Sequence, residues 1–144
     1  MRPFNLTCLL FAGALLLGAS AVQAKDDDTD VQLPAGTLGA ADVVKLFSNK
    51  TVETRTVVKK RDSLTYYHPA GEVIQQRDGT SRRGFWRVRE DGRICLQMEE
   101  LEEKCRIIVR GLGGGYRKYI VRKNGLHQPT VDYLGFVDGN QLDK

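Results

Sequence analysis

The residue types that support acid–base, nucleophilic or metal chemistry are scarce in this chain. Only two histidines, His68 and His127, occur among 144 residues, and a nucleophilic site needs such a base held against a serine, threonine or cysteine. Neither histidine lies in a motif such as G-x-S-x-G. Two histidines without regularly spaced partners also do not make a zinc site. We therefore expect no catalytic residue, no metal and no cofactor, and we expect the protein not to be an enzyme.

Carboxylates are concentrated between Cys95 and Cys105. The four acidic residues there are Glu99, Glu100, Glu102 and Glu103. A pair of carboxylates hydrolyses glycosides when the surroundings push their pKa values apart, but the sequence indicates no apolar pocket around these four. An exposed acidic loop that meets a cationic partner is the expected arrangement.

Basic residues alternate with apolar residues in several of the predicted strands. Side chains two apart in a strand share a face, so Arg87 and Arg89 lie on the side opposite Trp86. Lys118 and Arg122 likewise share one side of a later strand. We expect these four cations to face outward together, as a binding surface for anionic envelope lipid, anionic glycan or an acidic protein. The alternative is an ordinary solvated face that keeps the protein soluble.

The first 24 residues have the form of a secretory signal peptide. Arg2 is followed by the apolar run Leu6–Leu17 and by the cleavage pattern Val22-Gln23-Ala24. The apolar run is shorter than the roughly 20 residues of a transmembrane helix. We therefore predict cleavage after Ala24, a periplasmic protein without a transmembrane helix, and no nucleic-acid partner because of that compartment.

Cleavage would leave Cys95 and Cys105 as the only cysteines, because Cys8 lies in the signal peptide. Two cysteines in an exported chain make one disulfide. Its loop of about 11 residues is worth roughly 3 kcal/mol in the chain-entropy model. Strand alternation places Cys95 on the face opposite to that of the apolar Ile94, but it places Cys105 on the same face as the apolar Ile107. Because the two cysteines then fall on different faces, we expect a bulge near one of them.

The elements that carry these residues follow from hydrophobic periodicity. Residues 25–37 form a flexible acidic arm. A short helix opens at Thr37 or Leu38 and presents an apolar stripe. Turn signals such as Asp78-Gly79 and Asp91-Gly92 then separate eight alternating runs. The predicted strands are 51–59, 63–68, 73–77, 82–89, 94–98, 105–110, 116–122 and, more weakly patterned, 131–137.

Short loops between these strands favour one mainly β domain over residues 38–144. The topology expected is an antiparallel meander, closed as a curved sheet or a small open barrel with the N-terminal helix over one end. Trp86 and Val88 share the face expected to point into the core.

Three segments together resemble a family of small exported proteins of Gram-negative bacteria classed as a domain of unknown function. They are a Y-x-x-x-G turn within Tyr66–Glu72, a G-x-W-x-V strand at Gly84–Val88, and a G-x-x-C … C hairpin from Asp91 to Cys105. The resemblance covers Leu38–Asn140. It implies export, a β-rich fold and a disulfide, and it brings no activity with it.

The leading hypothesis is a non-enzymatic binding protein of the periplasm or envelope that uses the basic sheet face. The net charge of +4 allows this, since acidic residues gather in the arm and leave the domain more basic than the total. One alternative is a periplasmic inhibitor or immunity-type protein that acts through the acidic Cys95–Cys105 loop. The other is an enzyme of unrecognised type.

Overall fold

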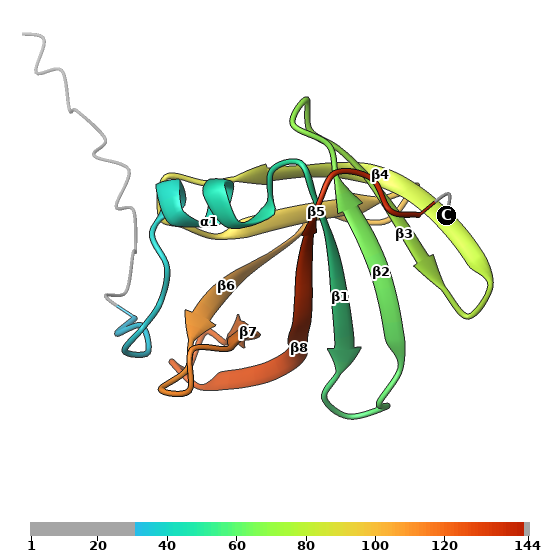
Figure 1. Ribbon diagram of the computed structural model, residues 1–144. Helices are drawn as coiled ribbons and strands as arrows, with labels where there is room; N and C mark the ends of the chain where they lie inside the picture. Colours follow the sequence, from blue (N-terminus) through green and yellow to red (C-terminus); the bar gives the residue numbers. More distant parts are fainter. Residues whose placement is uncertain (1–30, 143–144) are drawn as a thin grey trace, which may run out of the picture.

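The computed structural model describes residues 31–142, so the predicted signal peptide and residues 25–30 of the acidic arm lie outside the described residues. The fold is the expected antiparallel meander with one short helix, and it closes into an eight-stranded barrel (Figure 1). The elements are α1 Ala40–Phe47, β1 Lys50–Thr56, β2 Asp62–Tyr67, β3 Glu72–Arg77, β4 Thr80–Val88, β5 Ile94–Met98, β6 Lys104–Arg110, β7 Tyr116–Val121 and β8 His127–Asp138.

Pairing of β8 with β1 closes the barrel, with Lys50 opposite Asp138 at one end of the ladder. β8 is longer than the weak pattern of 131–137 suggested, since it already begins at His127. Pro129 obscured its start, because proline cannot donate to a strand ladder. It is tolerated here next to the register shift in the β7–β8 pairing, opposite Tyr119.

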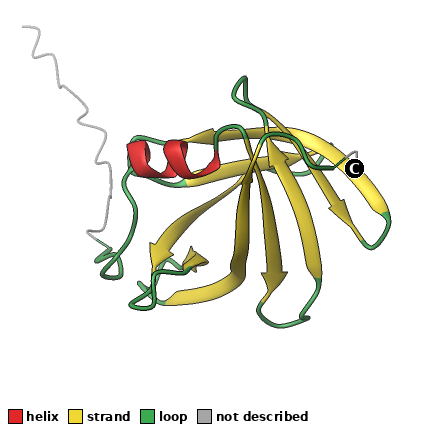
Figure 2. Ribbon diagram, viewed as in Figure 1, coloured by secondary structure: helices red, strands yellow, loops and turns green. Residues whose placement is uncertain are grey.

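The helix α1 lies across one end of the barrel (Figure 2) and places Val43 and Phe47 in the core. It begins at Ala40, two to three residues later than predicted. The preceding residues stay extended because they are bonded to β6: Leu38 N–H donates to the Ile108 carbonyl, and Arg110 N–H donates to the Gly36 carbonyl, each at 2.8 Å. This places part of the predicted arm against the barrel wall.

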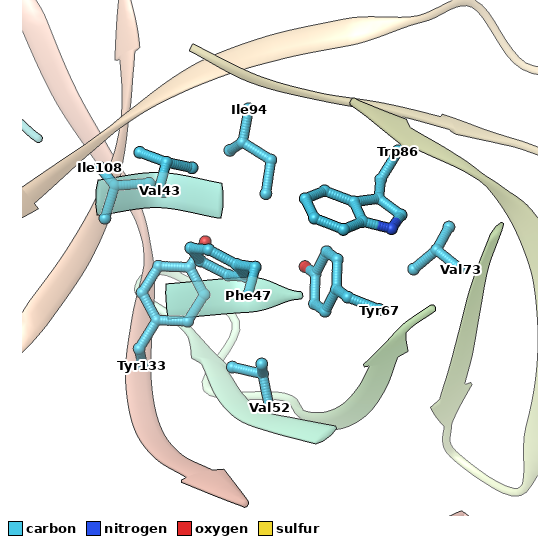
Figure 3. Packing of buried hydrophobic residues seen from close by; sticks show 9 residues of the cluster. All are labelled: Val43, Phe47, Val52, Tyr67, Val73, Trp86, Ile94, Ile108 and Tyr133. Atoms are coloured by element: carbon cyan, nitrogen blue, oxygen red, sulfur yellow. The ribbon is translucent and has the colours of Figure 1, made fainter. Parts of the chain in front are cut away.

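Aromatic side chains fill the end of the barrel next to α1. Figure 3 shows Phe47 between Tyr67 and Tyr133, with Trp86 beyond Tyr67. The ring centroid of Phe47 lies 5.0 Å from that of Tyr67 and 5.3 Å from that of Tyr133, both edge-on. Trp86 is buried as predicted, and its indole N–H donates to the His68 carbonyl at 2.8 Å. The polar tip of the tryptophan is therefore satisfied inside the core.

Cys95 and Cys105 form the predicted disulfide, directly opposite each other on β5 and β6 with their Cα atoms 3.9 Å apart. The predicted bulge near the cysteines is wrong, because these strands pair without a register shift at either residue. The error came from assigning every apolar side to the core. Ile107 and Val109 lie on the outer side of β6 with Cys105 and are nevertheless buried, Val109 next to a bridge from Thr37.

Candidate functional site

The four cations predicted to form one outer face do not lie together. Arg87 is exposed on the outside of β4, on the face opposite the buried Trp86, and Arg89 is exposed just after the end of this strand. Arg87 forms a two-pronged ion pair with Glu103 at 2.6 and 2.7 Å, and Arg89 reaches Asp91 at 3.6 Å. Both are therefore matched by acidic neighbours.

Lys118 corrects the prediction most clearly, because it faces into the barrel. It stands opposite the buried Ile108, and its ammonium lies 5.7 Å from the ring centroid of the core residue Tyr133, as in a cation–π contact. Arg122, just beyond the end of β7, is exposed and donates to Gln128. The alternation along β7 was correct, but the side that carries Lys118 is the inner one.

The predicted acidic loop is exposed and lies between β5 and β6. Glu99, Glu100 and Glu102 make no ion pair within residues 31–142, whereas Glu103 is held by Arg87. That hydrogen-bonded pairing lowers the pKa of Glu103 and raises that of Arg87. The carboxylate of Glu103 also lies near both cysteine sulfurs, but these are joined in the disulfide, so the three groups are no metal site.

A second group of cations lies on the inside of the barrel, and the strand patterns in the sequence did not predict that its members come together. We call Arg77, Arg82, Arg106 and Lys118 the lumen cations. Cross-strand pairing fixes their side: Arg82 stands opposite the inward Gln75, Arg106 opposite the buried Ile94, and Lys118 opposite Ile108. Four different strands, β3, β4, β6 and β7, thus deliver positive charge to one interior.

The lumen cations occupy the half of the barrel away from α1. β1 leaves the helix directly, so odd-numbered strands run away from it and even-numbered strands return. Arg77 ends β3, whereas Arg82 and Arg106 lie near the starts of β4 and β6, and Lys118 lies midway along β7. We call this half of the barrel the open end, because the aromatic cluster and α1 close the other.

The hydrogen bonds of the lumen cations go to neutral groups. Arg77 Nη2 donates to Ser63 Oγ at 3.4 Å, and Arg82 Nη2 donates to Gln75 Oε1 at 3.2 Å. Arg106 Nη1 donates to the backbone carbonyl of Cys105 at 2.8 Å. Within the described residues, none of the four pairs with a carboxylate. Arg77 Nε is buried and has no partner there. Each guanidinium has five donors, so most of this donor capacity remains unused.

The electrostatics show that the charges of Lys118 and Arg77 are only weakly compensated. Burial, then the positive charges of Arg106 and Arg77, lower the pKa of Lys118 to about 8. Burial, followed by the charges of Arg61 and Arg82, lowers the pKa of Arg77, and the carboxylate of Asp78 offsets this shift only in part. A buried charge is costly unless it is paired. A negatively charged ligand at the open end would remove that cost.

A cleft of about 580 Å³ lies beside Arg77, at the rim of the open end. Ser63, Arg77 and Thr80 line it from β2, β3 and β4. Three acidic residues also line the cleft. Asp62 accepts from Arg55 at 2.6 Å and Asp78 lies 3.8 Å from Arg61, whereas Glu53 makes no ion pair within residues 31–142. Arg77 is the lumen cation on this wall.

The lowered pKa of Lys118 predicts how the free energy of unfolding depends on pH. The unfolded lysine titrates near its ordinary value of 10.5, and the folded one near 8. Between these values the unfolded chain holds a proton that the folded chain has released, so stability rises with pH through this window. We expect Lys118→Met to be more stable than the wild type by about 1–3 kcal/mol at pH 7, with the difference vanishing near pH 10.5.

Urea unfolding of both proteins across this pH range measures the effect. The raised pKa values of the buried Tyr67 and Tyr133 also enter above pH 10, but they are common to both proteins and cancel in the difference. The exposed Lys123→Met serves as the matched control and should show no such pH dependence. A stability difference for Lys118→Met that stays constant with pH contradicts the inward placement of this ammonium.

The chain within residues 31–142 contains no helix that is both long and apolar enough to cross a membrane. Neither a scan against protein-family models nor a search of curated proteins finds a match to this chain.

Proposed function

We propose that this protein is an exported, non-enzymatic binding protein of the cell envelope that holds a small anionic ligand on the lumen cations. The observation that carries the proposal is the convergence of Arg77, Arg82, Arg106 and Lys118 on the barrel interior with only neutral partners. Binding sites are commonly found in the mouths of barrels. An eight-stranded barrel has an interior that side chains fill or that accepts one small ligand.

Binding is favoured over catalysis because neither histidine, the most frequent general base, lies at the open end. His68 lies in the β2–β3 turn at the α1 end, where its Nδ1 accepts from Ala70 N–H. His127 stands at the start of β8 and lines a separate cleft with residues 31–35. Neither imidazole joins the lumen cations, so the site would attract an anion without a histidine beside it to act as a general base.

The exposed acidic loop supports a second candidate function, that of an inhibitor that inserts this loop into a cationic protein. The disulfide ties both ends of the loop, because Cys95 and Cys105 pair directly across β5 and β6. Three of its four glutamates are free of ion pairs within the described chain. A rigid, negatively charged projection of this kind is suited to a basic cleft.

Calorimetric titration of the mature protein with inorganic phosphate, sulfate and acetate at low ionic strength tests the leading proposal. We expect at least one anion to bind with an affinity that falls as salt is added. The double variant Arg77→Gln/Lys118→Met should abolish the heat of binding. The matched control Arg87→Gln/Arg89→Gln removes the same charge from the outer face and should bind as the wild type does.

Two results would overturn this assignment. One is the absence of binding by all three anions. The other is an equal loss in the lumen variant and in the outer-face control, which would return the site to the outer surface of β4.

A further inference from the structure

We propose that the group bound by the lumen cations is a phosphate monoester at the end of a larger molecule, whose remainder stays outside the barrel. This inference rests on the proposed function and specifies its ligand. Three features of the open end carry it: the amount of positive charge, the geometry of the donors, and the closure of the opposite end.

The charge at the open end calls for a ligand with more than one negative charge. Four cations face one another there, with no carboxylate pairing within the described residues. A carboxylate or a phosphate diester brings one negative charge, whereas a phosphate monoester carries about −1.5 to −2 near neutral pH. The monoester therefore neutralises the lumen cations better than either alternative.

The donors also suit a phosphoryl group. Three of the four lumen cations are arginines, whose planar forks bind two oxygens of a phosphate at once, and the fourth is a lysine that acts as a point charge. Hydroxyl groups complete the set, since Ser63 Oγ lies 3.4 Å from Arg77 Nη2 and 2.8 Å from Thr54 Oγ1. A monoester presents three terminal oxygens, which matches this dense array of donors better than the two oxygens of a carboxylate.

The closed end of the barrel decides how the ligand is placed. Phe47, Tyr67, Trp86 and Tyr133 fill the interior below α1, so a molecule cannot pass through (Figure 3). A phosphate diester has substituents on both sides and would need room at both ends of the barrel. A terminal monoester needs only one way in, at the end of the barrel opposite α1, where Arg77 ends β3 and Arg82 and Arg106 lie near the starts of β4 and β6.

Binding should be accompanied by proton uptake. A dianion beside Lys118 favours its charged form and raises its pKa from about 8. Titrations at pH 8 in buffers of different ionisation enthalpy will therefore show uptake in the wild type. The Lys118→Met protein, which lacks this titrating group, should show less uptake.

The experiment compares four soluble probes with the mature protein: inorganic phosphate, glycerol 3-phosphate, dimethyl phosphate and acetate. We expect the two phosphate dianions to bind roughly tenfold or more tightly than the diester and acetate, as for one additional charge-assisted hydrogen bond. Lys118→Met and Arg77→Gln should each remove this preference, while Arg87→Gln should retain it.

A second binding experiment, with lipid vesicles, identifies whether the monoester belongs to a lipid or to a soluble molecule. Phosphatidylcholine vesicles that contain phosphatidic acid present a terminal monoester, and vesicles with the same fraction of phosphatidylglycerol present a diester. Binding to the first and not the second supports a lipid source. Binding of soluble monoesters with no vesicle binding supports a soluble source, and both results agree with the proposal.

The possible results distinguish the monoester inference from the more general proposal of anion binding. Equal affinity for glycerol 3-phosphate, dimethyl phosphate and acetate overturns the monoester inference but leaves an anion-binding protein. No binding of any probe overturns both. Because Lys118→Met is expected to stabilise the fold, a loss of binding in that variant cannot be attributed to unfolding.

Discussion

Replacing Phe47 by alanine should lower the free energy of unfolding by about 3–5 kcal/mol, the usual cost of removing a buried aromatic side chain. Phe47 is fully buried and contacts three aromatic rings, those of Tyr67, Tyr133 and Phe136, at centroid distances of 5.0, 5.3 and 5.6 Å. Together with Val43, it attaches α1 to the barrel core. Its loss leaves a cavity and loosens the helix in one step.

Urea unfolding, followed by the fluorescence of Trp86 beside this cluster, measures the change. Val44→Ala is the matched control on the same helix, because Val44 is 45% exposed and points away from the core. Its stability should stay within about 0.5 kcal/mol of the wild type. A comparable loss in both variants would mean that the helix contributes through its own stability and not through Phe47.

The disulfide carries the second large effect. Replacing both cysteines, Cys95→Ser with Cys105→Ser, should cost roughly 2–5 kcal/mol of the free energy of unfolding, the usual cost of removing a native disulfide from a small domain. The bond links neighbouring strands beside the acidic loop. Its removal acts mainly by giving the unfolded chain more freedom, because the strand pairing on both sides of it persists.

Thermal unfolding of the wild type with and without reductant provides the comparison. Reductant should lower the unfolding temperature of the wild type to that of the double variant, and it should leave the unfolding temperature of the variant unchanged. Two free thiols in the unreduced wild-type protein, or equal stability of both proteins without reductant, would contradict the assignment of a structural disulfide.

Local signals in the sequence were enough to locate the strands, because each strand and turn is encoded within a few residues. Asp91-Gly92 predicted the β4–β5 turn, and Gly92 does adopt a φ of +81° there. Trp86 alternates with exposed arginines, and this alone placed it in the core. The closure of the barrel was not fixed in the same way, since β1 and β8 meet across nearly the whole domain and no local pattern records their pairing.

The lumen cations were missed for a physical reason. Alternation identifies the two faces of a strand but not which of them is inside, and we assigned the charged face to solvent. On β6 the inner face mixes the two classes, with Ile108 beside Arg106, whereas the outer face carries the apolar and buried Ile107 and Val109. The inner face of each strand can be identified only once the pairing register of the whole sheet is known, because that register shows which residues of the four strands share the interior.

The pairing of β1 with β8 also sets the order of events in folding. Lys50 and Asp138, 88 residues apart, form an ion pair at one end of this ladder. Contacts of such high sequence separation form slowly, because the entropy of closing the long loop is lost before any contact compensates for it. Until β8 arrives, β1 and β7 are open edges whose unpaired backbone groups can pair with another chain. The nascent domain is therefore most exposed to aggregation just before its last strand is added, and the strand that completes the barrel also ends that exposure.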